Sequence, residues 1–446
     1  MDGDFKGDFT RDSLDPHRLR QFSRVLMQQG RVQLDADWNE QTDLLLHALR
    51  GFIKDLAGPH WGIFDFDVDP PRGTSKGRIT PKSISPNSFK IDDSTVQSRD
   101  FSIGGGHYYV DGILAENGKE GTTYRRQEPK QPVPTDAGPY LVYLDVWERQ
   151  VTFLEDQDIR EVALSENGPD TATRAEVVWQ VKLLKHQDVS DKDIINKNAF
   201  AKIKFVEDSA ADLQVQLQPE NRGFLKARGK APSEGDSNPC IISPDAQFRR
   251  NENQLYRVEI HTGGTATGGT TKEGATFKWS RENGSVVFPI VQVTEHAGSN
   301  IVTVTIENLG RDNSLSLEEN DWVEIIDDDY ILRVAALQGA STPLPLDSSL
   351  NPLLQVVEIG KTNSTSVQVT LKNIQGGPLV SVGQNHPLLR RWDQKEGTGN
   401  KGGQPKLEAK GSGTINIVEG KTEDTWLTLE DGVQIQFQPN ALGTPL

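Results

Sequence analysis

Hydrophobic residues in this 446-residue sequence recur with a helical period near the N-terminus and with the short spacing of strands after residue 60. In the first region the apolar side chains share one helical stripe: Trp38, Leu45, Leu49, Phe52 and Leu56. Gly58 and Pro59 follow, and both residue types end helices. The pattern predicts a helix of about twenty residues. Asp37, with Glu40 three residues later, predicts a capping box at its start.

The apolar stripe of this helix needs a partner surface, because it exposes more apolar area than a soluble chain normally leaves in water. The simpler interpretation is packing on the chain's own β-domain. The alternative is a contact with another subunit. Residues 22–34, ahead of the helix, mix hydrophobic side chains with Arg and Gln, which predicts an extended arm or a short helix.

From about Trp61 onward, short apolar segments separated by turn residues predict strands. Residues 101–112 predict two strand pieces around a bend at the glycine run 104–106, where another backbone can approach closely. Residues 140–147 are apolar on both alternating faces, which predicts a central strand covered on both sides. Residues 177–184 form a plausible neighbour for it.

A hairpin is the clearest local prediction in the second half of the chain. Residues 277–290 hold two alternating segments around Asn283-Gly284, the residue pair that type I′ turns prefer. Both turn residues are expected at positive φ, with Trp279 opposite Phe288 on the partner strand. A second hairpin is predicted at residues 426–437, folded at Asp431-Gly432.

The organisation is predicted to be mainly β, with an N-terminal arm and amphipathic helix followed by two β-sandwich or barrel-like domains with long loops. The expected divisions are residues 1–60, 61–195 and 196–446, with a possible small C-terminal β-unit at 390–446. Polar stretches at 188–197 and 226–239 mark a boundary and a loop. Further strands are predicted at residues 301–306, 322–326, 330–334, 354–359, 367–371 and 415–418.

Composition narrows the possible function classes. The formal net charge of −16 disfavours binding to nucleic-acid phosphates. Cys240 is the only cysteine, which excludes intrachain disulfides and thiolate zinc clusters. The N-terminus lacks a signal-peptide pattern and no apolar run could span a bilayer, so we expect a chain made in the cytoplasm, without a membrane span.

No motif for catalysis, phosphate binding or metal binding stands out. The eight histidines are scattered, without metal-ligand spacing. Asp327-Asp-Asp329, with Asp321 and Glu324 upstream, is the densest acidic cluster. Calcium could bind such a cluster, yet the favoured interpretation is a solvated turn. We therefore expect no catalytic residue, no cofactor and no bound metal, although spacing alone does not exclude a carboxylate pair for glycoside hydrolysis.

Two N-terminal stretches, residues 6–11 (KGDFTR) and 22–41 (FSRVLMQQGRVQLDADWNEQ), resemble the N-terminus of an uncharacterised bacterial family. That family resembles components of contractile injection systems and phage tails. Residues 277–286 (FKWSRENGSV) and 390–393 (RRWD) are similar to its later signatures. Residues 106–112 and the strand at Tyr140 are similar to β-segments of phage baseplate and tail-fibre attachment proteins. The resemblance also implies a further aromatic strand after the last hairpin, so we expect the last domain either to be shortened or to take its final strand from a neighbouring chain.

The resemblance implies a structural subunit of a phage-tail-like particle, baseplate-associated or accessory, and supplies no catalytic residues. The expected assembly interface alternates charge with apolar anchors: Arg24, Leu26, Arg31, Leu34 and Trp38. Its partners would be other particle subunits, with the chain a homo-oligomer or present in several copies. The assembled particle would be released or membrane-attached. The alternatives are a fibre-like surface- or glycan-binding module and, more remotely, a polysaccharide hydrolase.

Overall fold

The computed structural model of the chain describes residues 22–62, 66–68, 79–81, 88–92, 100–118, 121–127, 140–164, 171–185, 224–230, 255–264, 266, 274–296, 299–309, 315–328, 330, 353–361, 366–373, 386–395, 413–430 and 432–438. The chain divides into two compact units, Phe5–Ala210 and, in the main, Ala211–Leu446. The KGDFTR motif, Cys240, residues 188–197 and the predicted strand residues 331–334 lie outside the described ranges.

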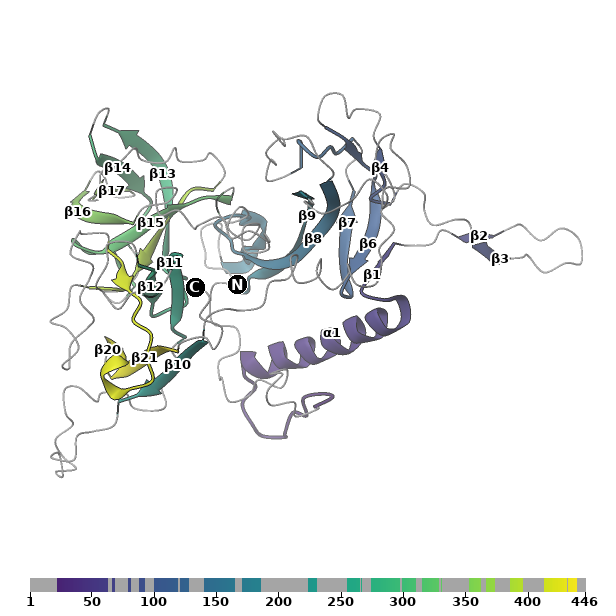
Figure 1. Cartoon of the computed structure of the whole chain (residues 1–446), viewed down its shortest axis with the longest axis horizontal. Helices are drawn as coiled ribbons and strands as arrows, with labels where there is room; N and C mark the ends of the chain where they lie inside the picture. Colours follow the sequence, from purple (N-terminus) through teal and green to yellow (C-terminus); the bar gives the residue numbers. More distant parts are fainter. Residues whose placement is uncertain are drawn as a thin grey trace, which may run out of the picture. The chain divides into compact units, whose positions relative to one another are not determined.

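The first unit combines one long helix with small antiparallel sheets. α1 (Asp35–Ala57) precedes a three-stranded sheet of β1 (His60–Gly62), β6 (Gly106–Val110) and β7 (Ile113–Asn117). The described residues of the unit also form three strand pairs: β2 (Phe66–Val68) with β3 (Ile79–Pro81), β4 (Ile91–Asp92) with β5 (Ser102–Ile103), and β8 (Tyr140–Val151) with β9 (Arg174–Lys185). Figure 1 shows the long β8–β9 ribbon beside β6 and β7.

The core of the first unit lies where β9 meets the segments around β5. It contains Phe101, Ile103, Tyr124 and Val181, and the half-buried rings of Phe89 and Trp179 pack edge to face against each other at its margin. At the glycine run, Gly106 has φ of 132° and lies against Ser88, so that an added Cβ would stand 3.0 Å from the Ser88 Cα. The predicted bend with close backbone approach is therefore confirmed.

The second unit contains a closed barrel with the strand order β13-β14-β17-β16-β15-β18. Its strands are β13 (Val287–Glu295), β14 (Ile301–Ile306), β15 (Trp322–Ile326), β16 (Leu354–Lys361), β17 (Val367–Lys372) and β18 (Leu388–Trp392). Alternation fills its interior, since Val302, Val304 and Ile306 of β14 are buried and the residues between them are not. Closure leaves every strand of this sheet with two neighbours.

Two three-stranded sheets accompany the barrel in this unit: β11 (Arg257–Thr262), β12 (Thr276–Ser280) and β19 (Ile415–Asn416) in one, and β10 (Phe224–Gly229), β21 (Val433–Gln438) and β20 (Leu427–Glu430) in the other. Their apolar faces share a core with the barrel strands, in which Phe277, Trp279, Trp322 and Trp392 are buried together. Single 3₁₀ turns occupy Gln157–Ile159, Val162–Leu164 and Glu423–Thr425.

The predicted turn at Asn283-Gly284 is confirmed, but the prediction that its two flanking strands pair as a hairpin is wrong. Both residues have positive φ, 52° and 73°, and the Ser285 amide donates to the Glu282 carbonyl at 2.9 Å. The flanking strands nevertheless separate, since β12 pairs with β11 and β19 while β13 pairs with β14 and β18. Trp279 therefore lies opposite Val258, and Phe288 opposite Leu389.

The reason is that the RRWD segment takes the place of the hairpin partner. The Arg391 amide donates to the Val286 carbonyl, and the Asp393 amide donates to the Trp279 carbonyl, each at 3.0 Å. Asp393 also accepts from the Arg281 amide at 2.8 Å. β18 thus lies between the two strands that the turn connects, and the two segments that resemble family signatures bond to each other directly.

Other predictions divide between confirmed and wrong. The class is confirmed: a mainly β chain with an N-terminal helix and, in the second unit, a barrel. The strands at 301–306, 322–326, 354–359, 367–371 and 415–418 and the hairpin at 426–437 are also confirmed. The strand at 140–147 is not central, because β8 pairs with β9 alone among the described strands and those of its side chains that the structure describes are half-buried. The loop predicted from residue 226 begins instead as β10, which pairs with β21.

Candidate functional site

α1 begins earlier than the capping-box pattern predicts. Its first residue is Asp35 and its N-cap is Leu34, which makes no side-chain capping hydrogen bond. The prediction of a capping box formed by Asp37 and Glu40 is therefore wrong. Asp35 and Asp37 instead lie in the first turn, where carboxylates favour the positive end of the helix dipole. The helix ends as predicted at Gly58, whose φ is 94° and whose amide donates to the Lys54 carbonyl at 2.8 Å.

Charged side chains attach α1 to the strands of its own unit. The Arg50 guanidinium donates to both Glu148 carboxylate oxygens of β8, at 2.6 and 3.2 Å. Lys54 pairs with Asp111 at 2.9 Å, in the turn between β6 and β7. Gly112 in the same turn has φ of 80° and lies so close to Arg50 that a Cβ would come 2.7 Å from its Cα. A glycine and two ion pairs therefore hold the helix here.

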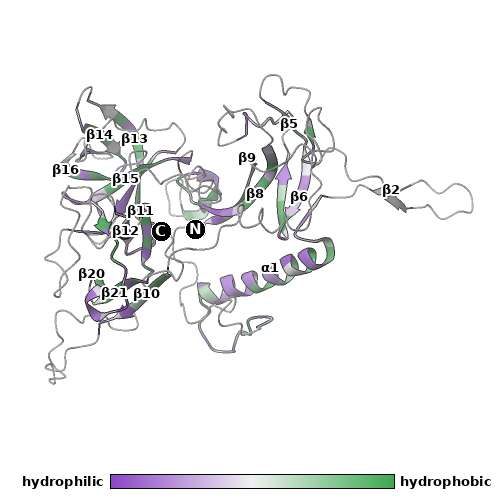
Figure 2. Cartoon of the chain, viewed as in Figure 1, coloured by the Kyte–Doolittle hydropathy of each residue, from purple (hydrophilic) through white to green (hydrophobic). Residues whose placement is uncertain are grey.

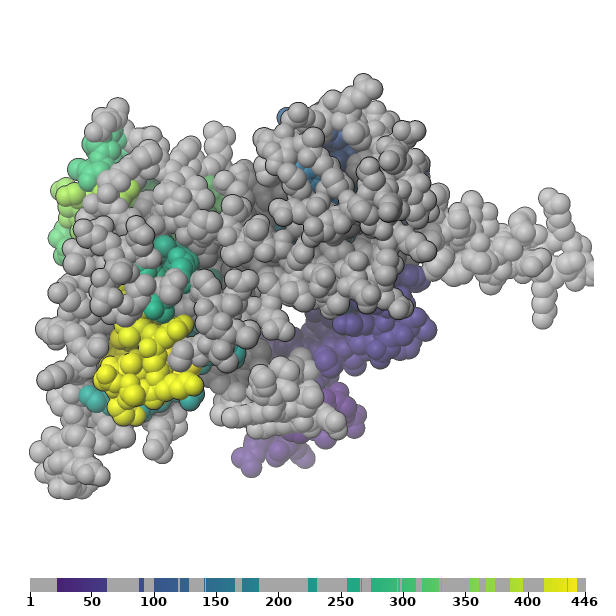
Figure 3. Space-filling model, viewed as in Figure 1, coloured from purple at the N-terminus to yellow at the C-terminus, as the bar shows by residue number. Residues whose placement is uncertain are grey.

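The apolar stripe of α1 faces away from these attachments. Its five side chains, Trp38, Leu45, Leu49, Phe52 and Leu56, are each between 51% and 75% exposed, whereas Ala36 and Leu44 are buried. Figure 2 shows hydrophobic and hydrophilic residues alternating around the helix, and Figure 3 shows part of α1 at the molecular surface. The interpretation that the stripe packs on the chain's own β-domain is wrong in this structure.

The arm ahead of α1 is irregular and carries further exposed apolar side chains: Phe22, Leu26, Met27, Val32 and Leu34. It turns at Gly30, which has φ of 74°, and the Val25 amide donates to the Gln41 side chain of α1 at 2.9 Å. The arm is thereby tied to the first half of the helix. The five residues expected at an assembly interface, Arg24, Leu26, Arg31, Leu34 and Trp38, are all exposed, and Trp38 belongs to the helix stripe.

A second constellation, unforeseen from the sequence, is a buried ionic network in the second unit. The Lys278 ammonium of β12 donates to both oxygens of Glu324 on β15, each at 2.9 Å, and both side chains are almost fully buried. Glu324 also accepts from Trp392 Nε1 at 3.0 Å and from the Tyr330 hydroxyl at 2.8 Å. Glu259 stands 3.3 Å from the same ammonium.

The charges of this network shift the pKa values of its members. Burial works to raise the pKa of Glu324, but the Lys278 ammonium outweighs it and the net shift is downward. Burial is likewise overcome at Glu259, where Lys278, Arg257 and Arg390 lower the pKa to about 2. Burial and the charge of Lys278 lower the pKa of His261 to about 4, so this imidazole is neutral at neutral pH.

The network connects neighbouring strands in the described structure. Each oxygen of Glu324 already accepts two hydrogen bonds, and Lys278 also lies 4.3 Å from the centre of the Trp392 ring. These contacts join β12 to barrel strands β15 and β18. The sequence signal was a charged residue inside an otherwise apolar strand, as in FKW around Lys278 and VEI around Glu324, which marks a buried charge with a buried partner.

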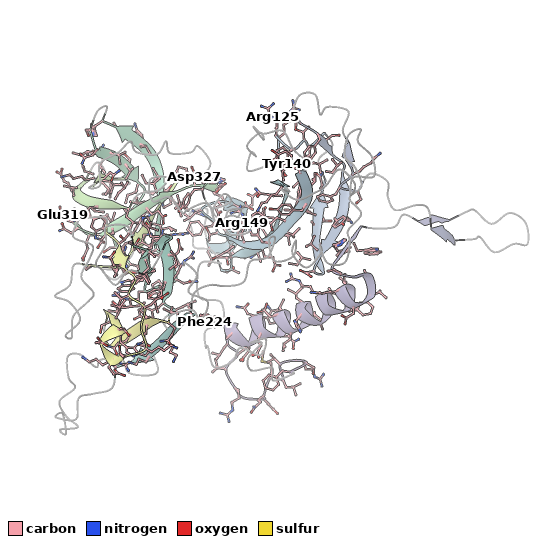
Figure 4. All side chains as sticks on the ribbon, viewed as in Figure 1. Arg125, Tyr140, Arg149, Phe224, Glu319 and Asp327 are labelled. Carbon is pink, nitrogen blue, oxygen red and sulfur yellow. The ribbon has the colours of Figure 1, made fainter. Side chains whose placement is uncertain are left out.

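The described residues of the acidic cluster at β15 do not form the solvated turn that was expected. Asp321, Glu324 and Asp327 are buried, and each has its own internal donor. Asp321 accepts from the Glu318 amide at 2.8 Å and Asp327 from the Tyr330 amide at 2.6 Å (Asp327 is labelled in Figure 4). Asp328 pairs with His386 at 2.8 Å. In the described ranges no group of three His, Cys, Asp or Glu side chains is arranged to hold a metal ion.

The chain belongs to a protein family described as a family of unknown function, DUF6519, which it matches over residues 5–230 and 223–444. The two matched segments meet at β10. Neither a curated protein nor a solved structure matches the chain. Within the part of the chain that the structure describes, no helix has the length and apolar content to cross a membrane.

Proposed function

We propose that the chain is a structural subunit of a phage-tail-like contractile injection particle, baseplate-associated or accessory, that acts by docking and not by catalysis. In this proposal the arm and the stripe of α1 form the docking surface, with Arg24 and Arg31 setting register around apolar anchors. The subunit is made in the cytoplasm and then joins the particle. The β-rich units serve as spacer and contact surface.

One observation carries the proposal: α1 is attached through Arg50 and Lys54 while its apolar stripe is exposed. A surface helix of a self-sufficient domain turns its apolar face inward. The opposite orientation leaves exposed apolar side chains on the helix and on the arm, of the kind that mark interaction sites. This same segment, residues 22–41, belongs to the N-terminal motif that resembles an uncharacterised bacterial family, and that family in turn resembles injection-system components.

The test is incorporation into particles by a chain with a weakened arm. Leu26→Ser with Leu34→Ser removes two exposed anchors and leaves the fold intact, since neither side chain is buried. We expect at least a tenfold loss of the subunit from purified particles, measured by quantitative mass spectrometry. The matched control, Gln28→Ser with Gln33→Ser, changes two exposed polar residues of the same arm and should join normally. Normal occupancy of the leucine variant would show that the arm is not the docking surface.

A surface- or glycan-binding module is the second candidate, favoured by rings on β1 and β6. His60 stacks on Tyr108 with centroids 6.5 Å apart, and Trp61 packs near Tyr109 at 5.9 Å. His60 is exposed and the other three are half-buried, so ring faces of this kind could stack on sugars. Binding of the isolated chain to a glycan array, abolished by Trp61→Ala, would favour this candidate.

A further inference from the structure

The exposed stripe of α1 has the spacing of a coiled-coil seam. With Thr42 included, which is also exposed, its positions are 38, 42, 45, 49, 52 and 56, so the intervals alternate between four and three residues. That alternation is what packing against another helix requires, whereas a flat sheet or a loop requires no such repeat. The residues that flank the seam are mostly uncharged: Asn39, Gln41, Leu46, Ala48 and Ile53, with Asp55 the exception. The seam therefore fits a helix.

We propose that α1 pairs with α1 of a second copy of this chain, antiparallel, about a two-fold axis that crosses the seam at the level of residue 47. The inference rests on the proposed function in one respect, because it takes the outward seam as part of the docking surface and names what covers it. An isologous contact of this kind uses the same patch on both copies. α1 is also the one long helix that the described residues offer as a partner.

Side-chain sizes favour the antiparallel direction. With the axis at the level of residue 47, Trp38 lies opposite the partner's Leu56, Leu45 opposite the partner's Leu49, and Thr42 opposite the partner's Phe52. Each layer then contains either a larger side chain paired with a smaller one or two side chains of equal size, as close packing requires. A parallel pair would instead stack Trp38 on itself and Phe52 on itself and leave two threonines facing each other.

Charge favours the same direction. A parallel pair would bring both copies of Asp35 and Asp37 together, whereas an antiparallel pair keeps the two sets of carboxylates apart by the length of the helix. The arm adds a second match. Because Val25 bonds to Gln41 on one flank of the seam, antiparallel pairing places neighbouring Arg24 next to the partner's Asp55 on that flank.

A membrane surface is the competing occupant of an exposed amphipathic helix. Helices that lie on anionic membranes carry Lys and Arg along the polar face. α1 has only Arg50 and Lys54, both engaged with carboxylates of its own unit, and the chain has a net charge of −16. The observations therefore favour a protein partner, and vesicle binding becomes an outcome of the test.

The first experiment measures the mass of the purified full-length chain by sedimentation velocity over a hundredfold range of concentration. We expect a concentration-dependent dimer that Leu45→Asp weakens at least tenfold. His47→Asp is the matched control, because it places the same charge two residues away, on an exposed position outside the seam. Circular dichroism should show both variants folded. A wild-type chain that stays monomeric, or a Leu45→Asp chain that still dimerises, would overturn the pairing.

The second experiment determines direction in a Cys240→Ser background, which removes the one native thiol. Thr42→Cys mixed with Phe52→Cys should form a heterodimeric disulfide, because these positions face each other in the antiparallel register. Thr42→Cys alone should not cross-link, since ten residues of helix separate the two positions by about 15 Å, far beyond disulfide reach. The reverse result would establish a parallel pair and refute the proposed register.

The outcomes separate this inference from the proposed function. A chain that dimerises through α1 but never enters particles supports the pairing and overturns the particle assignment. A monomeric chain that enters particles through its arm overturns the pairing alone. A monomeric chain that binds vesicles of anionic lipid, and loses that binding with Leu45→Asp, shows that the seam serves a membrane and refutes the protein partner.

Discussion

On α1 the charged side chains attach the helix to its own unit and the apolar ones face outward, whereas between β12, β15 and β18 charges are buried inside an apolar core. Both regions depart from the usual arrangement, in which apolar side chains are buried and charged ones are exposed. Lys278 and Glu324 are charged and buried, and each is the other's partner within one chain. On α1, in contrast, apolar side chains lie at the surface: Leu45 is 65% exposed and Phe52 is 64% exposed. Exposed apolar side chains gathered on one helix face are typical of interaction sites.

The largest expected effect comes from removing one charge of the buried network. Lys278→Met leaves Glu324 buried without its cation, which should cost about 3–5 kcal/mol of unfolding free energy. Lys54→Met is the matched change at the helix, where the ion pair with Asp111 is exposed, and should cost at most about 1 kcal/mol. Urea titration of both variants measures the difference. Equal effects would mean that the network contributes no more than a surface pair.

A smaller effect should distinguish two glycines. Gly284 has φ of 73°, which side chains adopt at a cost, so Gly284→Ala should destabilise the second unit by about 1–2 kcal/mol. Gly51 lies within α1, and a Cβ there would meet nothing within 4 Å. Gly51→Ala should therefore stabilise the helix by roughly 0.5–1 kcal/mol. Thermal melts that show shifts of the same sign for both variants would contradict the turn geometry.

The buried network should also make stability depend on pH through His261. Its pKa is about 4 in the folded chain, below the ordinary value of 6.5, so the unfolded chain binds a proton first as the pH falls. The stability it contributes is fully present above pH 6.5 and is lost between that pH and pH 4. Glu259, with a pKa of about 2, acts in a lower window, from its ordinary value of 4.5 downward.

His261→Gln provides the check on this pH dependence. The variant should flatten the loss of unfolding free energy between pH 6.5 and 4, by on the order of 1–3 kcal/mol, and leave the steeper loss below pH 4.5 unchanged. Denaturant titrations at half-unit steps of pH measure both windows. An unchanged slope above pH 4.5 would show that His261 titrates normally in the folded chain.

Local pattern predicted the parts of this fold that local physics determines. Alternation in β14, the glycine end of α1 and the positive φ of Asn283 and Gly284 all follow from nearest-neighbour geometry. The pairing of β12 failed because it depends on residues 390–393, more than a hundred positions away, which displace the adjacent strand.

The sequence predicted which residues form the stripe of α1, but it did not predict that the stripe faces away from its own unit. The helical period identified the stripe from Trp38 to Leu56, yet periodicity alone does not say which side of a helix its own domain covers. The decisive contacts are Arg50 with Glu148 and Lys54 with Asp111, which join residues 98 and 57 positions apart. The sequence of residues 35–57 alone does not predict these two ion pairs.

The smallest expected effect on the unfolding free energy comes from substituting Leu45, and its neighbour Leu44 provides the direct comparison. Leu44 is 5% exposed and Leu45 is 65% exposed, although they are adjacent in the same turn of α1. Leu44→Ala should cost about 2–4 kcal/mol at any protein concentration, because it leaves a cavity beneath the helix. Leu45→Ala should change the unfolding free energy by less than about 0.5 kcal/mol in dilute solution, where the chain is monomeric.

Concentration then separates the two explanations of an exposed leucine. If α1 pairs with a second copy, the dimer stabilises the fold by mass action, so the wild-type melting temperature rises with protein concentration. Leu45→Ala should reduce that rise because it removes apolar area from the seam, while Leu44→Ala lowers every melting temperature by a similar amount. Melts at concentrations spanning three orders of magnitude measure both behaviours. A Leu45→Ala chain that tracks the wild type throughout would mean that Leu45 lies outside any self-contact.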